Sequence, residues 1–168
     1  MLDVVLRTLW FIFPAYAANA FPVVLKGTRP LDFGRTLRMQ RILGDGKTIE
    51  GTFGGIAFGI AAGMLQLYLQ QAGIVPVVLT VQLVVLLSVG AILGDIAGAF
   101  IKRRLGMPRG HSFFPLDQLD FVAGALVLSS TVYQFDIWTI AVLLLVTPPI
   151  HYGTNVIGYI LRFKRTPW

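Results

Sequence analysis

Residues 51–94 carry no charged side chain, although the whole chain is only 168 residues long. A single helix of that length, rising about 1.5 Å per residue, would be about twice as long as the roughly 30 Å hydrocarbon core of a bilayer. The chain therefore has to turn once within this run. The turn is predicted at residues 70–73, shortly before Pro76, where polar residues, glycine and proline coincide.

The remaining apolar runs extend the same interpretation. The chain is 55% hydrophobic and 13% charged, with a mean hydropathy of +0.74, which is more apolar than a soluble core of this length needs. Further spans are predicted at residues 4–25, 116–133 and 137–161. We predict an all-α integral membrane protein, a bundle of five transmembrane helices that forms a single domain over residues 1–168.

The basic residues mark one side of this bundle. Thirteen of the fourteen Lys and Arg residues lie in three segments, which are residues 26–47, 102–109 and 162–165, and only Arg7 lies elsewhere. With five spans these segments share one side, which the positive-inside rule makes cytoplasmic, so the N-terminus is expected outside. Cytoplasmic loops are expected at about residues 26–52 and 102–115.

The first apolar run has a competing interpretation as a signal peptide. Residues 15–17 resemble a small-x-small cleavage site after an apolar stretch. Against this, Asp3 and Arg7 balance each other where a signal peptide carries net positive charge. The chain has no cysteine, which excludes disulfides and thiolate ligands.

Glycines recur every fourth residue in the second and third predicted spans. They are Gly55, Gly59 and Gly63, then Gly90, Gly94 and Gly98. Such stripes let another helix backbone approach closely. The second stripe is adjacent to Asp95, so these glycines either serve packing alone or also leave space for an ion or a phosphate.

Three of the eight acidic residues stand at the ends of apolar segments, where carboxylates are functional candidates. Asp117 and Asp120 are three residues apart and share a helical face, and with Asp95 they could converge on one hard cation. Oxygen ligands without Cys or a His cluster favour Mg²⁺. The structural alternative makes Asp117 a helix N-cap and Asp120 a first-turn residue favoured by the helix dipole.

Basic residues accompany both groups of acids. Lys102, Arg103 and Arg104 follow Asp95, and cation-holding acids beside phosphate-holding bases are typical of phosphoryl or nucleotidyl transfer. His111 and His151 are isolated, and a structural hydrogen-bonding role is the simpler interpretation of each.

The segment of residues 26–48 is predicted to cover an anion. Gly44, Gly46 and Gly51 allow close backbone approach, and Lys47 and Thr48 supply a charge and a hydroxyl for phosphate. The segment is not a Walker A loop, because an arginine stands at position 41 where that motif has glycine. A polybasic segment that attracts anionic headgroups is the alternative.

These residues also allow two functions other than phosphoryl or nucleotidyl transfer, namely ion transport and a scaffold role. A transporter could pass protons or cations along the acids, but these lie at one membrane face, and the spans offer little polar beyond Gln66, Gln82 and Ser88. A scaffold that binds anionic lipid would explain the basic loops but not the acids.

Five motifs in this order resemble the archaeal CDP-archaeol synthases over nearly the whole chain. They are NAFP at residues 19–22, PLDFG at 30–34, LGDGKTIEG at 43–51, GD at 94–95 with FIKRRLG at 100–106, and DQLDF at 117–121. Each motif alone is weak, but the five together are specific. The last two are also similar to CDP-diacylglycerol synthases, where they serve the metal.

The resemblance implies a reaction and roles for the residues. CTP and 2,3-bis-O-geranylgeranyl-sn-glycerol 1-phosphate would give the CDP-activated ether lipid and pyrophosphate, with Mg²⁺. CTP, this lipid and membrane lipids are the expected partners, with no nucleic acid among them. Asp95, Asp117 and Asp120 would hold Mg²⁺ and, with Lys102, form the catalytic set; Lys47, Thr48, Lys102 and Arg103 would contact phosphates. Asn19, Pro22, Lys26 and Asp32 are assigned loosely to the nucleotide pocket and its loop.

Overall fold

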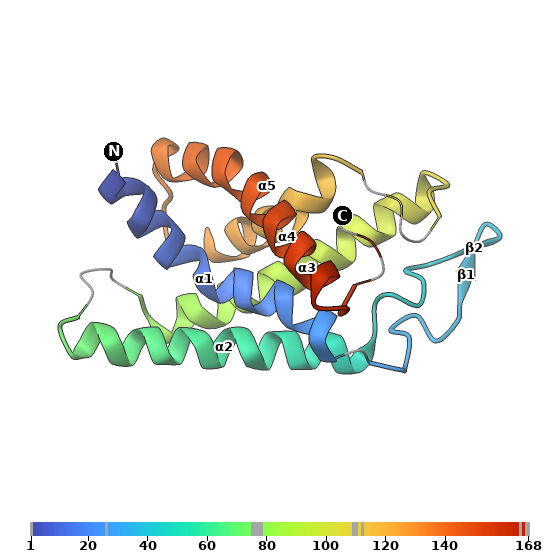
Figure 1. Ribbon diagram of the computed structural model, residues 1–168, viewed down its shortest axis with the longest axis horizontal. Helices are drawn as coiled ribbons and strands as arrows, with labels where there is room; N and C mark the ends of the chain where they lie inside the picture. The colour runs from blue at the N-terminus through green and yellow to red at the C-terminus, as the bar shows by residue number, and fades with distance from the viewer. Residues whose placement is uncertain are drawn as a thin grey trace.

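The computed structural model describes residues 2–25, 27–74, 79–108, 111, 113–164 and 166. Its elements in chain order are α1 (Leu2–Leu25), β1 (Thr36–Leu37), β2 (Gln40–Arg41), α2 (Ile49–Gln71), α3 (Val81–Arg104), α4 (Leu116–Ser129) and α5 (Ile137–Ile160). The two strands pair antiparallel as a small hairpin outside the helical bundle (Figure 1). The predicted turn is confirmed, because α2 ends at Gln71 and Gly73 has a positive φ, while Pro76 lies outside the described residues.

Within the described residues, four helices are long and apolar enough to cross a membrane, namely α1, α2, α3 and α5. The fourth predicted span is helical only over the 14 residues of α4, which is about 21 Å and short of the bilayer core. The helix ends where the hydroxyls of Ser129, Ser130 and Thr131 bond back to carbonyls of its last turn. The all-helical class is confirmed, and the number of five spans stays a prediction.

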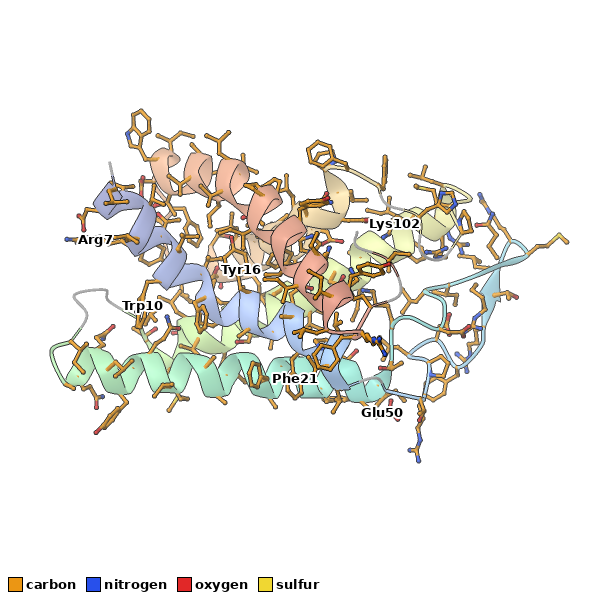
Figure 2. The ribbon with its side chains drawn as sticks, viewed as in Figure 1. Arg7, Trp10, Tyr16, Phe21, Glu50 and Lys102 are labelled. Atoms are coloured by element: carbon orange, nitrogen blue, oxygen red, sulfur yellow. The ribbon has the colours of Figure 1, made fainter. Side chains whose placement is uncertain are left out.

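The basic segments lie at one end of the bundle, as the sequence predicts. The loop before α2 and the end of α3 are on the right in Figure 1, on the side of the hairpin, and α5 runs from the upper left towards the same side. Figure 2 shows Lys102 and Glu50 at this end and Arg7 at the other. The helices therefore alternate in direction as expected, which places the candidate site at a single end.

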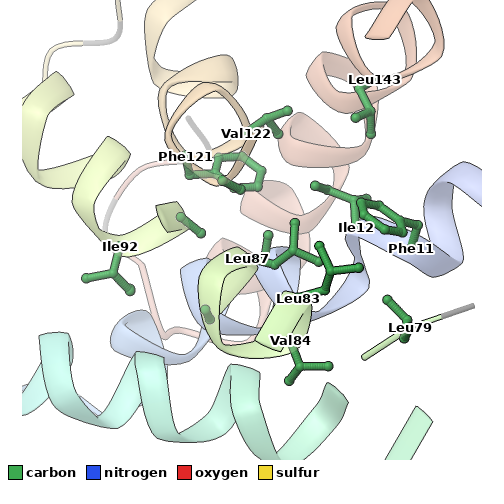
Figure 3. Close-up of a cluster of buried hydrophobic side chains, with 14 of the residues drawn as sticks. Phe11, Ile12, Leu79, Leu83, Val84, Leu87, Ile92, Phe121, Val122 and Leu143 are labelled. Carbon is green, nitrogen blue, oxygen red and sulfur yellow. The ribbon is translucent and has the colours of Figure 1, made fainter. Parts of the chain in front are cut away.

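Close helix packing brings the site together. Figure 3 shows α3 contributing Leu83, Val84, Leu87 and Ile92 to the buried core. The predicted role of both glycine stripes in packing is confirmed by what a methyl group would meet at each position. At Gly59 it would crowd Ala18, Pro14 and Ser88, and at Gly90 it would crowd the backbone of Gly124.

Polar side chains inside the bundle satisfy helix carbonyls. Pro14 has no N–H to offer the carbonyl of Trp10, one turn earlier in α1. Gln66, only 2% exposed, donates to that carbonyl instead at 2.7 Å. Ser88 likewise donates to the carbonyl of Val84 at 2.8 Å. Gln66 and Ser88 therefore have structural roles.

Candidate active site

Two ion pairs join three segments at the basic end of the bundle. Lys47 Nζ, from the loop before α2, lies 2.5 Å from Asp95 Oδ2 on α3. Lys102 Nζ, about two turns further along α3, lies 2.6 Å from Asp117 Oδ1 on α4. All four side chains are partly buried, between 18% and 25% exposed. Predicted bases and predicted acids thus meet in pairs.

Asp120, the third predicted acid, lies against the glycine stripe of α3. A methyl group on Gly98 would overlap its carboxylate, so this glycine leaves the space that the side chain occupies. The charge of Asp120 interacts with those of Asp95, Lys47 and Asp117. The second stripe therefore serves packing at Gly90 and makes room for the Asp120 side chain at Gly98, while space for an ion or a phosphate stays a prediction.

Asp117 has a local role as well as its ion pair. The position before α4 is Pro115, which makes no side-chain cap, so the interpretation of Asp117 as the N-cap is wrong. Asp117 lies in the first turn instead, where its Oδ2 accepts a hydrogen bond from the Phe113 amide at 2.9 Å. This bond fixes one carboxylate oxygen and leaves the other facing Lys102.

The acids offer the ligand chemistry of a hard cation. Among the described residues, no three acidic or histidine side chains are grouped closely enough to hold a metal ion. Asp95 and Asp117 each face a lysine instead. Carboxylate oxygens are the ligands that hard divalent cations prefer, but grouping these acids around one ion would require the two lysines to move away.

A small cavity of about 30 Å³ adjoins the first ion pair at the N-terminus of α2. Its lining comprises Pro22, Gly46, Lys47, Thr48, Gly51, Thr52, Ile92, Asp95 and Ile96. Thr48 caps α2, because its hydroxyl accepts from the Gly51 amide at 3.1 Å. The cavity is large enough for about one water molecule, so any larger ligand would require the loop to move away from Asp95.

Asp32 organises the loop between α1 and α2. Its side chain is 1% exposed and accepts hydrogen bonds from Arg41 at 2.6 Å and from the amides of Gly34, Leu43 and Gly44. The Arg41 guanidinium and these amides hold the pKa of Asp32 well below its usual range. Its role in this structure is to hold the loop in shape.

Asp32→Asn is expected to loosen the loop by about 1–3 kcal/mol, because it removes the charge that Arg41 and three amides stabilise. The lowered pKa means that this contribution is full above the unfolded-state pKa of about 3.9 and is lost as pH falls through the folded-state pKa. Limited proteolysis of the loop at pH 7 measures the change. Asp45→Asn is the control, since Asp45 also pairs with Arg41 at 2.8 Å but is 57% exposed; equal cleavage of both variants would contradict the assignment.

Arg104 attaches the hairpin to α3. Its guanidinium donates to the carbonyl oxygens of Leu37 at 2.7 Å and Arg41 at 2.8 Å. Arg103 donates to the carbonyl of Met107, which closes the turn after α3. Of the basic run, Lys102 is thus the residue whose charge pairs with an acid of the site.

The α5 side of the site was missed by sequence reasoning. Lys164 is half-buried, and its charge interacts with those of Asp117, Lys102, Lys47 and Asp95, while burial lowers its pKa. His151 bonds Asn155 at 3.2 Å and stacks on Phe121, as its structural interpretation predicts. Only the i, i+4 spacing of His151 and Asn155 was visible in the sequence.

Comparisons with known proteins identify the family of the chain. A family model described as CarS-like: CDP-archaeol synthase matches residues 1–168. The chain belongs to the CDP-archaeol synthase family. The CDP-archaeol synthase of Thermococcus gammatolerans is 47% identical over 161 residues, which are 95% of this chain and 94% of that protein. The CDP-archaeol synthase of Pyrococcus horikoshii is 43% identical over 164 residues, which are 97% of this chain and 96% of that protein.

A solved structure with this fold has also been described, as that of an intramembrane enzyme for archaeal membrane lipids biosynthesis. It is 40% identical, has a TM-score of 0.80, and the match covers 90% of this chain and 94% of that chain. The resemblance to the CDP-archaeol synthases inferred from five motifs is confirmed.

The other residues considered for the site lie on α1 and after α3 or outside the described residues. Asn19 is partly buried on α1, about one turn before Pro22 of the cavity. Lys26 lies outside the described residues, so its predicted role stays a prediction. His111 is exposed after α3.

Proposed function

We propose that this chain transfers the cytidylyl group of CTP to 2,3-bis-O-geranylgeranyl-sn-glycerol 1-phosphate, forming CDP-archaeol and pyrophosphate. The observation that carries the proposal is the pair of lysine–aspartate contacts at one bundle end, Lys47 with Asp95 and Lys102 with Asp117. A lipid phosphate oxygen attacks the α-phosphorus of CTP in line, and the bond to the pyrophosphate oxygen breaks. The protein mainly positions two anions and neutralises their charge.

The acids and bases divide this work. Asp95, Asp117 and Asp120 would hold Mg²⁺, which when bound neutralises phosphate charge. Lys47 and Lys102, released from Asp95 and Asp117, would then bind phosphate oxygens. The present ion pairs would neutralise the partly buried acids until the substrates arrive.

The location suits a lipid substrate. The proposed site lies at the ends of helices that cross the membrane, so it meets a lipid phosphate at headgroup depth. We assign this end to the cytoplasm, with the N-terminus outside and five passes in one domain over residues 1–168, because the positive charge is concentrated there. The formal net charge of +6 would attract both anionic substrates.

Ion transport gains no support from the interior of the bundle. Gln66 and Ser88, two of the buried polar residues in the predicted spans, donate to carbonyls of Trp10 and Val84. A transport pathway instead needs polar groups near the membrane midplane that can bind the passing ion.

Incorporation of radiolabelled CTP into lipid tests the proposal. Purified protein with the ether lipid phosphate and Mg²⁺ is expected to form a labelled CDP-lipid, and excess EDTA is expected to abolish the product. Restoring Mg²⁺ should restore it, which separates metal removal from denaturation. Folded protein that forms no product from the ether lipid phosphate would contradict the proposed function.

A further inference from the structure

The chain reverses direction immediately after α5. Arg162 has a φ of 60°, in the left-handed region, and the amides of Phe163 and Lys164 both donate to the carbonyl of Gly158, at 2.9 and 3.1 Å. This is the pattern of a helix ended by a left-handed residue. The reversal lays Lys164 back along the last turn of α5.

Gly158 makes room for this lysine. A methyl group at Gly158 would be in van der Waals contact with the Lys164 side chain, 3.5 Å from Cγ and 3.6 Å from Cδ. The lysine stem therefore crosses the helix at a position without a side chain. This arrangement gives the ammonium group a restricted position in place of a fully solvated one.

The charge of Lys164 belongs to the acid and lysine cluster. Its largest electrostatic interaction is with Asp117 on α4, followed by those with Lys102, Lys47 and Asp95. The cavity beside Lys47 and Thr48 is lined by residues of α1, α2, α3 and the loop before α2, and Lys164 is not among them. Lys47 and Lys164 therefore contribute positive charge to the cluster from different segments, the loop before α2 and the segment after α5.

An open groove of about 520 Å³ adjoins Lys164. It is lined by Tyr159, Ile160, Arg162 and Lys164. Ile160 is 69% exposed and Leu161 is 58% exposed at the end of a helix that is long and apolar enough to cross the membrane. Exposed apolar side chains and basic groups together suit the level where lipid tails meet headgroups.

We propose that Lys164 binds the phosphate of the lipid substrate and holds it beside Asp117. The inference rests on the proposed function. Two phosphate-bearing ligands reach this site, and the groove favours the lipid, because it opens at headgroup depth and is lined by both apolar and basic side chains. The nucleotide phosphates are assigned to the Lys47 side of the cluster.

Lys164→Met is expected to raise the KM for the ether lipid phosphate by about 10- to 100-fold, because a charge-assisted contact to phosphate is lost. The KM for CTP should stay within about twofold of the wild-type value. Lys164→Arg, which keeps the charge, should recover most of the affinity for lipid. Steady-state kinetics in mixed micelles, varying each substrate in turn, separates these effects.

Arg38→Gln is the matched control, because it removes one positive charge from an exposed position on the hairpin at the same end. Size-exclusion profiles, Tm in detergent and Mg²⁺–CTP binding by calorimetry should be unchanged in every variant. If Lys164→Met does not fold, Lys164→Gln takes its place under the same expectations.

The remaining outcomes overturn the inference. A higher KM for CTP with an unchanged KM for lipid would assign Lys164 to the nucleotide. Unchanged kinetics for both substrates would show that Lys164 binds neither of them. A wild-type protein that makes no CDP-lipid would instead refute the proposed function.

Discussion

Asp95→Asn is expected to lower CDP-lipid formation by about 10²- to 10³-fold while the bundle stays folded. The substitution keeps the size of the side chain but removes the charge that faces Lys47 at 2.5 Å and that would hold Mg²⁺. Lys47 is 25% exposed and can move towards water, so we expect a loss of stability of only about 1–2 kcal/mol. Labelled CTP incorporation measures the activity, and Tm in detergent measures the fold.

Asp3→Asn provides the control for this variant. Asp3 pairs with Arg7 at 2.9 Å, but its side chain is 71% exposed at the opposite end of the bundle. Its substitution should leave turnover unchanged. Substantial turnover by folded Asp95→Asn protein would show that the reaction does not depend on the Asp95 carboxylate.

Local chemistry explains which parts of the fold the sequence predicts. An uncharged run too long for one helix requires a turn, and the described turn after Gln71 follows from polar and flexible residues at that point. The end of α4 does not follow from hydropathy, because residues 130–133 remain mostly apolar or weakly polar. At this point the hydroxyls of Ser129, Ser130 and Thr131 donate hydrogen bonds to carbonyl oxygens of the last turn of the helix.

The candidate site, like the fold, could be predicted from the sequence only in part. Acids at the ends of apolar segments were visible in the sequence because charge there is costly, and Asp95 and Asp117 do lie in one cluster with lysines. The pairing of Lys47 with Asp95 spans 48 positions and arises only from helix packing. The position of Lys164 could not be predicted for another reason. It depends on the left-handed backbone at Arg162, and an arginine in the sequence does not indicate that the chain reverses there.

Gly98→Ala is expected to lower turnover by about 10²-fold, because a methyl group there would overlap the Asp120 carboxylate and displace it from the cluster. Part of the strain can be relieved by rotation of that side chain, so the loss of stability should be about 1–3 kcal/mol. Activity should therefore fall much more than Tm. CTP incorporation and thermal unfolding in detergent are measured on the same preparation.

Two other glycines separate this effect from helix packing. At Gly94 a methyl group would overlap the backbone carbonyl oxygen of Asp120, which cannot rotate away, so Gly94→Ala should destabilise the bundle more than Gly98→Ala does. At Gly153, inside α5, it would meet nothing within 4 Å, and alanine should stabilise the helix by about 0.5–1 kcal/mol with normal turnover. If Gly98→Ala lowers Tm as far as Gly94→Ala and keeps its turnover per folded molecule, Gly98 serves packing alone, and Asp120 has no role that depends on its present position.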